Sequence, residues 1–429
     1  MATVSVGGDT PPSYEVEDDH SLPLYTCSVP SSECLLQTEP PRITNCPTCD
    51  WIFETKHMRI NLGPRLWKLH TPSYGLNGRI EGTIRLSKDV ETVTMTLEGR
   101  IRVTTISQRS TLSADTVLTL VSQTATIYDA QKAESSAEED RPFSLTVPHE
   151  TQFKEQFITL PPSHLSYHPL VSTEVNYSVK FHAKRKGKGL KKTESKTVRI
   201  LYLPKSTPSE PPLYAIPRPS QGRDDTDLYH LYNRVKTIPL TPFHPDFGKS
   251  KSNESSLDNF TSRVFLSLPY PLCFSSGQII PFTMSLAFPD DPFLALALRG
   301  NRIELFRRLN VWKKGSSEVL QRDDIVSSSA LKFGREYSEG VWLLRGDIKA
   351  GDQGKEVSWI LDGVAEVQYV LRVILRPSIN LLGSVPCFKH EEVVKITTDS
   401  WGILDRELSS MGGTPTPAIG LAANVRQTK

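Results

Sequence analysis

Apolar and polar residues alternate along most of residues 51–205, with turn-forming residues between the alternating segments. The alternating apolar face takes Ile80, Gly82, Ile84 and Leu86 in one segment and Val93, Met95 and Leu97 in the next. A spacing of two is that of β-strands, and no 15-residue stretch shows the apolar stripe of a helix. Gly99 follows this run and is predicted to be a bulge or a point of close approach. The pattern predicts an antiparallel β-sandwich over residues 51–205.

A second series of alternating segments predicts another sandwich over residues 256–400. Between them, residues 206–255 are rich in proline, which cannot donate to a sheet ladder, and we interpret them as a linker. The predicted fold class is therefore all-β, with two tandem antiparallel immunoglobulin-like β-sandwiches. The composition of residues 401–429 predicts a disordered tail.

Residues 1–50 are predicted to be a disordered acidic tail because they combine prolines, serines and threonines with eight acids and one base. The whole chain carries +2, so this −7 segment leaves +9 on the remainder. Such a mild excess does not by itself imply a nucleic-acid partner. No apolar run is long enough to cross a bilayer and no secretory leader begins the chain, which predicts a protein of the cytosol or nucleus, and we expect it in the cytoplasm.

The tetrapeptide Pro-Pro-x-Tyr occurs twice, at Pro11–Tyr14 and at Pro211–Tyr214. The composition of the chain would place it here roughly 0.07 times by chance. Both copies fall in segments predicted to be irregular, so both are expected to be accessible. We interpret them as binding motifs.

Four stretches resemble the arrestin fold, especially the α-arrestins of fungi. They are GRIEGTIRL followed by VETVTMTLEGRI, FITLPPSH before VNYSVKFHAKRKG, KTVRILYLP, and SSGQIIPFTMSLAFP. The resemblance covers about residues 51–205 and, less specifically, 256–400. The linker of about 50 residues is much longer than a simple hinge, which departs from visual arrestins.

The resemblance implies a non-enzymatic adaptor. α-Arrestins recruit WW-domain HECT ubiquitin ligases through Pro-Pro-x-Tyr motifs and bring them to membrane transporters or receptors, which are then ubiquitinated and internalised. It implies peripheral recruitment to the plasma membrane or endosomes. An arrestin-fold scaffold that sorts endosomal cargo without a ligase, similar to a retromer subunit, is the alternative.

Consecutive prolines favour the polyproline II conformation, so little conformational entropy remains to be lost on binding. The aromatic groove of a WW domain holds a proline ring, and the tyrosine occupies a neighbouring pocket. The predicted WW-binding residues are Pro11, Pro12, Tyr14, Pro211, Pro212 and Tyr214. SLPLY at Ser21–Tyr25 is a degenerate Leu-Pro-x-Tyr version.

Basic residues gather around Gly187 and Gly189, between two predicted strands, which favours a hairpin with a cationic tip. They are Lys184, Arg185, Lys186, Lys188, Lys191 and Lys192. These residues could contact anionic lipid headgroups, bind acidic or phosphorylated cargo tails, supply lysines that the ligase modifies, or blunt an edge strand as a solvated turn. No aromatic residues alternate with them, so nucleic acid is not the expected partner.

We find no catalytic constellation, and we expect no enzyme activity and no cofactor. His164 and His168 are interpreted as surface or turn residues, and Glu391 and Glu392 as pointing to opposite faces of a strand. Cys46 and Cys49 have metal-knuckle spacing, but no second tight pair accompanies them. Together with Cys27 and Cys34 or His57 they could bind zinc only through irregular loops, so no metal site is predicted. An enzyme on a β-sandwich remains a third hypothesis.

Overall fold

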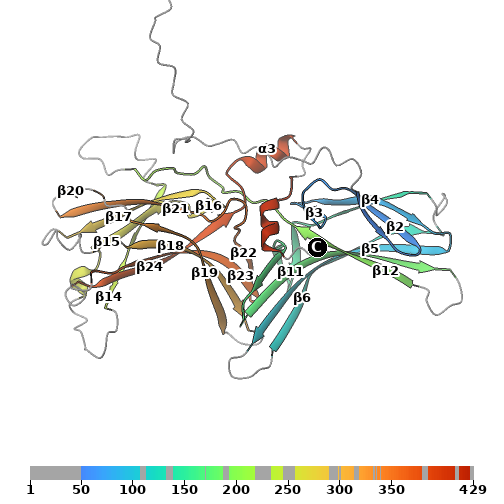
Figure 1. Ribbon diagram of the computed structural model, residues 1–429, viewed down its shortest axis with the longest axis horizontal. Coiled ribbons are helices and arrows are strands. Elements are labelled where there is room, and N and C mark those ends of the chain that lie inside the picture. Colours follow the sequence, from blue (N-terminus) through green and yellow to red (C-terminus); the bar gives the residue numbers. More distant parts are fainter. Residues whose placement is uncertain are drawn as a thin grey trace, which may run out of the picture. The chain divides into compact units, whose positions relative to one another are not determined.

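The computed structural model describes residues 50–106, 113–131, 139–169, 171–186, 193–217, 233–244, 257–288, 298, 301–313, 318–331, 334, 336–338, 340–378, 385–410 and 415–425. Nearly all regular structure in this part of the chain is β, arranged in several largely antiparallel sheets (Figure 1). The all-β prediction is confirmed, and the sheets are consistent with β-sandwiches. Each sheet takes its strands either from residues before 203 or from residues after 234.

The earlier residues form two main sheets. The four-stranded sheet has the order β1 (Asp50–Glu54), β2 (Met58–Pro64), β4 (Arg79–Leu86), β7 (Arg141–Thr146). The six-stranded sheet has the order β3 (Ser73–Tyr74), β12 (Thr193–Tyr202), β11 (Val171–Arg185), β5 (Val90–Ile106), β6 (Ser113–Asp129), with β10 (His164–Tyr167) also paired to β11. A small hairpin joins β8 (Glu150–Phe153) to β9 (Gln156–Thr159). Phe143 of the four-stranded sheet contacts Phe181 of the six-stranded sheet edge to face, with ring centroids 5.4 Å apart.

The later residues form two more sheets. The five-stranded sheet has the order β13 (Val235–Pro239), β15 (Val264–Pro269), β17 (Ile279–Ala287), β21 (Val341–Lys349), β20 (Glu336–Ser338). The seven-stranded sheet has the order β14 (Thr241–Phe243), β24 (Cys387–Thr397), β23 (Ala365–Leu375), β18 (Arg302–Trp312), β19 (Val319–Ala330), with β16 (Cys273–Ser275) on β24 and β22 (Trp359–Leu361) on β23. Phe288, just after β17, contacts Phe388 of β24 edge to face.

The alternation read from the sequence sets the buried faces of β4 and β5. Ile80 and Ile84 are fully buried, as are Val93, Met95 and Leu97, while the residues that alternate with them, such as Glu81, Thr94 and Thr96, are partly or fully exposed. The prediction for Gly99 is also confirmed, because the register of β5 against β6 shifts between Gly99 and Arg100. A Cβ on Gly99 would lie 2.6 Å from the Tyr177 ring, so only glycine fits there.

The structure differs from the sequence prediction inside residues 206–255. β13 and β14 lie there, and Ile238 and Leu240 are buried in the core. Prolines are tolerated in these strands because β13 and β14 are edge strands, which have a ladder on one side only. The two strands are short and lie between proline-rich segments, so the alternation of buried Ile238 and Leu240 with exposed neighbours was not recognised in the sequence.

The structure also differs for residues 401–429, which the sequence predicts to be a disordered tail. α3 (Ile403–Ser410) is an α-helix, and η4 (Ile419–Asn424) is a 3₁₀-helix. Leu421 and Val425 pack with Leu201 and Leu203 in a small apolar cluster. Although the segment is rich in glycine, alanine and proline, its few apolar side chains bury enough apolar surface against Leu201 and Leu203 to hold it in a defined structure.

Candidate functional site

The second Pro-Pro-x-Tyr copy lies in the irregular segment that follows β12. Pro211 is exposed, Pro212 and Leu213 are half-buried, and the Tyr214 residue is 40% exposed. The segment belongs to no strand or helix, so its backbone is not committed to a sheet ladder. The tyrosine is therefore presented at the surface rather than packed in a core. The first copy, with Pro11, Pro12 and Tyr14, lies outside the described residues.

Arg234, one residue before β13, holds the start of this copy. Its Nη2 donates a hydrogen bond to the Pro211 carbonyl oxygen, and its Nε lies 3.7 Å from Glu210 Oε2. The Tyr270 amide donates to the Arg234 carbonyl oxygen at 2.7 Å, which fixes Arg234 against the end of β15. The motif thus contacts the body of the protein on one side.

The predicted basic hairpin has the expected strand pairing, because β11 and β12 pair antiparallel up to Lys184 opposite Thr193. Lys188, Lys191 and Lys192, at its tip, lie outside the described residues. Lys184 and Lys186 are exposed at its base, and Lys184 Nζ lies 3.4 Å from Glu91 Oε2.

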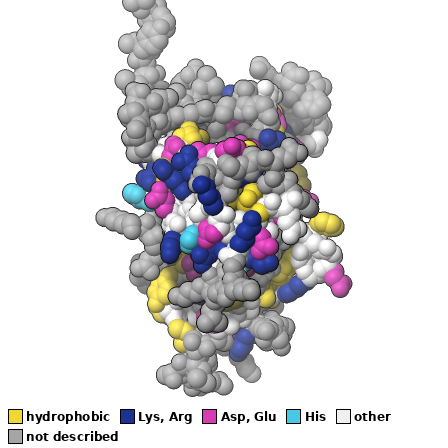
Figure 2. Space-filling view, turned by 90° about the vertical axis from the view of Figure 1, so that its right-hand side faces the viewer, with side chains coloured by type: hydrophobic (Ala, Val, Ile, Leu, Met, Phe, Trp, Pro, Cys, Tyr) yellow, Lys and Arg dark blue, Asp and Glu magenta, His cyan; other side chains and the backbone are white. Residues whose placement is uncertain are grey.

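Arg185 does not project into solvent like its neighbours. Its Nη1 lies 3.3 Å from Asp89 Oδ2 and 3.0 Å from His57 Nε2. Hydrogen bonds from Ser87 and Arg185 keep the pKa of the Asp89 carboxyl below its ordinary value. Figure 2 shows Lys and Arg side chains interspersed with Asp and Glu on one face of the molecule. Arg185 therefore acts within the fold, whereas Lys184 and Lys186 stay exposed, with Lys184 beside Glu91.

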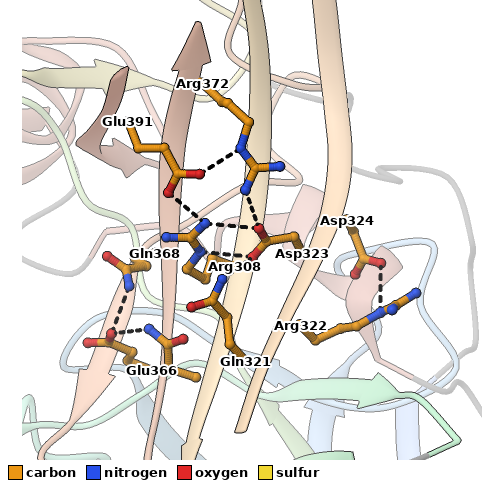
Figure 3. Close-up of polar contacts among 10 residues, drawn as sticks. Arg308, Gln321, Arg322, Asp323, Asp324, Glu366, Gln368, Arg372 and Glu391 are labelled. Carbon is orange, nitrogen blue, oxygen red and sulfur yellow. Dashed lines mark hydrogen bonds and ion pairs between the residues drawn. The ribbon is translucent and has the colours of Figure 1, made fainter. Parts of the chain in front are cut away.

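Four charged side chains on the seven-stranded sheet form a closed ring of alternating charge, which the sequence analysis missed (Figure 3). Arg308 of β18 makes two hydrogen bonds to Asp323 of β19, at 2.8 and 2.9 Å. Arg372 of β23 donates to Asp323 and to Glu391 of β24, both at 2.7 Å, and Arg308 closes the ring to Glu391 at 2.9 Å. We call these four residues the charge ring.

The charge ring covers apolar surface. The guanidinium carbon of Arg372 lies 4.1 Å from the Phe306 ring centroid, and Phe306 is buried beneath it. The hydrogen bonds from Arg308 and Arg372 lower the pKa of Asp323, and they outweigh the effect of partial burial on Glu391 so that its pKa is lowered too. Each charge is compensated inside the ring, which fits a role in holding four strands together.

Glu391 and Glu392 point to opposite faces of β24, as predicted. Glu391 joins the charge ring, whereas Glu392 lies within 2.9 Å of Lys236 Nζ and 3.1 Å of His390 Nε2. The two carboxylates therefore cannot act as a pair on one substrate.

The prediction that His164 is a surface or turn residue is wrong. Only 6% of His164 is exposed, and its ring contacts Trp359 edge to face. Burial, reinforced by Arg307, lowers the pKa of His164 to about 3. The sequence around it, bracketed by prolines, gave no sign that a strand as short as β10 would pack against residues two hundred positions away.

His164 lines an open groove of about 380 Å³ together with Tyr167, Arg307, Asp324 and Asn424. Arg307 lies 3.7 Å from Asp324 Oδ2 and 3.6 Å from Glu356 Oε2. Two carboxylates therefore compensate the cation in this groove.

No group of three or more potential metal ligands occurs among the residues that the structure describes. Cys273 and Cys387 have free thiols, and burial raises the pKa of both. The cysteines of the alternative zinc site, Cys27, Cys34, Cys46 and Cys49, lie outside this part of the chain. Within the same part, no helix combines the length and apolar character that a bilayer crossing requires.

Comparison with known proteins gives no match: no protein-family model and no curated protein sequence matches this chain.

Proposed function

We propose that the protein is a non-enzymatic adaptor of the α-arrestin type. Its two Pro-Pro-x-Tyr copies bind the WW domains of a HECT ubiquitin ligase, and two tandem β-sandwiches of the arrestin fold bind membrane transporters or receptors. The ligase then ubiquitinates this cargo for endocytosis. The protein works in the cytoplasm and is recruited peripherally to the plasma membrane or endosomes.

The observation that carries the proposal is the second motif, which lies at the surface in an irregular segment with Tyr214 exposed. A WW groove binds its ligand in an extended conformation, and a motif inside a sheet could not adopt it without breaking the ladder. The duplication adds a second argument, because two weak sites on one chain increase the effective concentration of a ligase with several WW domains.

The exposed Lys184 and Lys186 support peripheral membrane contact. Each basic side chain near an anionic leaflet contributes roughly 1 kcal/mol, so two residues alone give weak binding. The remaining basic residues predicted for the tip would have to contribute the rest.

Co-purification with a tandem WW-domain fragment of a HECT ligase tests the proposal. Tyr14→Ala and Tyr214→Ala should each weaken capture, and the double variant should abolish it. Tyr167→Ala is the matched control, because Tyr167 is 83% exposed but does not stand at the Pro-Pro-x-Tyr spacing from a pair of prolines. Unchanged capture of the double variant would refute ligase recruitment. Membrane association that persists in cells without HECT ligases would then favour the sorting scaffold.

A further inference from the structure

We propose that the second Pro-Pro-x-Tyr copy is partly masked by the protein's own surface, and that Arg234 is the residue that holds it there. This inference rests on the proposed function, because it concerns the regulation of the same motif. It assigns different roles to the two copies: the second becomes fully available to a WW domain only when it leaves the body.

The hold begins at the first residue of the motif. Arg234 Nη2 donates to the Pro211 carbonyl, and the Arg234 guanidinium also faces the Glu210 carboxylate at 3.7 Å. Only 27% of the Arg234 side chain is exposed, although its hydrogen bond to Pro211 lies at the surface. One side chain thereby fixes two consecutive residues of the segment.

The motif also has a surface to rest on. Pro211, Pro212 and Leu213 line the same small pocket as Pro269, Tyr270 and Pro271, at the end of β15. The space left between them is about 10 Å³, which scarcely admits one water molecule. One face of the motif therefore lies against a proline- and tyrosine-lined surface. Tyrosine is an aromatic residue of the kind that lines a WW groove, and proline is the residue that such a groove binds.

This arrangement leaves the two parts of the motif unequally available. Pro211 is exposed and Tyr214 is 40% exposed, but Pro212 and Leu213 are half-buried. A WW groove must enclose a proline ring as well as the tyrosine, so it competes with the protein's own surface. The apparent association constant of the folded chain is then the intrinsic association constant multiplied by the fraction of molecules in which the segment is released.

Binding of one purified WW domain, measured by isothermal titration calorimetry, tests the inference. The folded protein is the full chain with Tyr14→Ala and Tyr25→Ala, so that the second copy is the motif under study. A synthetic peptide spanning residues 205–220 gives the affinity of the released motif. The variant Arg234→Ala is made in the same full chain. Lys236→Ala is the control, because Lys236 lies only two residues further along the chain, in β13, but pairs with Glu392.

We expect the peptide to bind about fivefold to tenfold more tightly than the folded chain, since release must break one charge-assisted hydrogen bond and its packing. Arg234→Ala should recover at least about threefold of this difference, and Lys236→Ala none of it. Tyr270→Ala, which removes part of the surface under the motif, should also tighten binding. It serves as the test if Arg234→Ala does not fold.

Equal affinity of peptide and folded chain, or no gain in affinity from Arg234→Ala and Tyr270→Ala when these variants are folded, would overturn the masking. A peptide that does not bind would instead refute the proposed function at this copy, and the masking with it.

Discussion

Lys205 and Glu407 form an ion pair in which only 9% and 8% of the two side chains are exposed, although 202 residues separate them in the sequence. Thr416 completes the arrangement, because its hydroxyl accepts a hydrogen bond from Lys205 Nζ at 2.8 Å and its amide donates to Glu407 at 3.2 Å. The C-terminal segment is thus joined to the residues that follow β12.

Glu407→Ala should lower the free energy of unfolding by about 3 kcal/mol, because it removes the carboxylate that is paired with the buried Lys205 ammonium. Chemical denaturation followed by circular dichroism measures this loss. Asp405→Ala is the control on the same helix, where an exposed carboxylate contributes less than about 1 kcal/mol. Lys205→Met combined with Glu407→Leu should cost less than Glu407→Ala alone, since it removes both charges. A Glu407→Ala loss no larger than that of Asp405→Ala would show that the pair is not stabilising.

The charge ring gives a second prediction, in which a two-bond arginine–carboxylate contact inside the ring is compared with the same kind of contact at an exposed site. Asp323→Ala should cost about 2 kcal/mol, because Arg308 and Arg372 lose the acceptor they share. Asp140 is the matched control: it binds Arg85 through the same two-bond geometry at 2.9 Å, but both side chains are 52% exposed. Asp140→Ala should cost less than about 1 kcal/mol. Equal losses for the two variants in denaturant unfolding would show that neither burial nor the second arginine adds stability to the ring.

Gly99 gives a third prediction. Gly99→Ala should destabilise the protein by about 2 kcal/mol, because the new methyl group would overlap Tyr177 and Val121, at 2.6 and 2.9 Å. Tyr177 cannot move aside easily, since its buried hydroxyl donates to the Pro161 carbonyl at 2.6 Å. A double-mutant cycle with Tyr177→Leu, measured by thermal unfolding, should show that the two losses are less than additive. Strict additivity would mean that Gly99 is required for another reason.

The strands of the first two sheets could be predicted because their signal is local. Alternation along Val93, Met95 and Leu97 needs no knowledge of the partner strand, and a glycine in such a run marks a bulge or a close approach. The motif at Pro211–Tyr214 was equally readable, because its composition excludes a sheet interior.

The charge ring, the burial of His164 and the ordered C-terminal segment could not be predicted, because they depend on register and on long-range packing. Asp323 faces Arg308 only through the pairing of β19 with β18, and Glu391 reaches Arg372 only through that of β24 with β23. Opposite charges at facing positions would have been a usable signal if the register had been known. The prolines beside Ile238 and Leu240 argued against strands, because proline is tolerated only in edge strands. Whether a strand lies at the edge of a sheet depends on the tertiary structure, so it could not be read from the sequence.

The buried His164 predicts a loss of stability in acid. Its pKa is about 3 in the folded protein and 6.5 in its ordinary state, so the unfolded chain takes up the proton first as the pH falls below 6.5. Above pH 6.5 the imidazole is neutral in both states and contributes no pH dependence. Below it, this residue should cost about 1.4 kcal/mol per pH unit, or roughly 2–3 kcal/mol between pH 6.5 and 4.5. Arg307 opposes protonation, while Asp324 and Glu356, which face Arg307, keep that cation in place.

His164→Phe retains an aromatic ring against Trp359 but cannot take up a proton, so its unfolding free energy should fall less steeply over this range. His149→Gln, at an exposed position, controls for the loss of a histidine. Parallel pH profiles for the wild type and His164→Phe in urea unfolding would contradict the assignment.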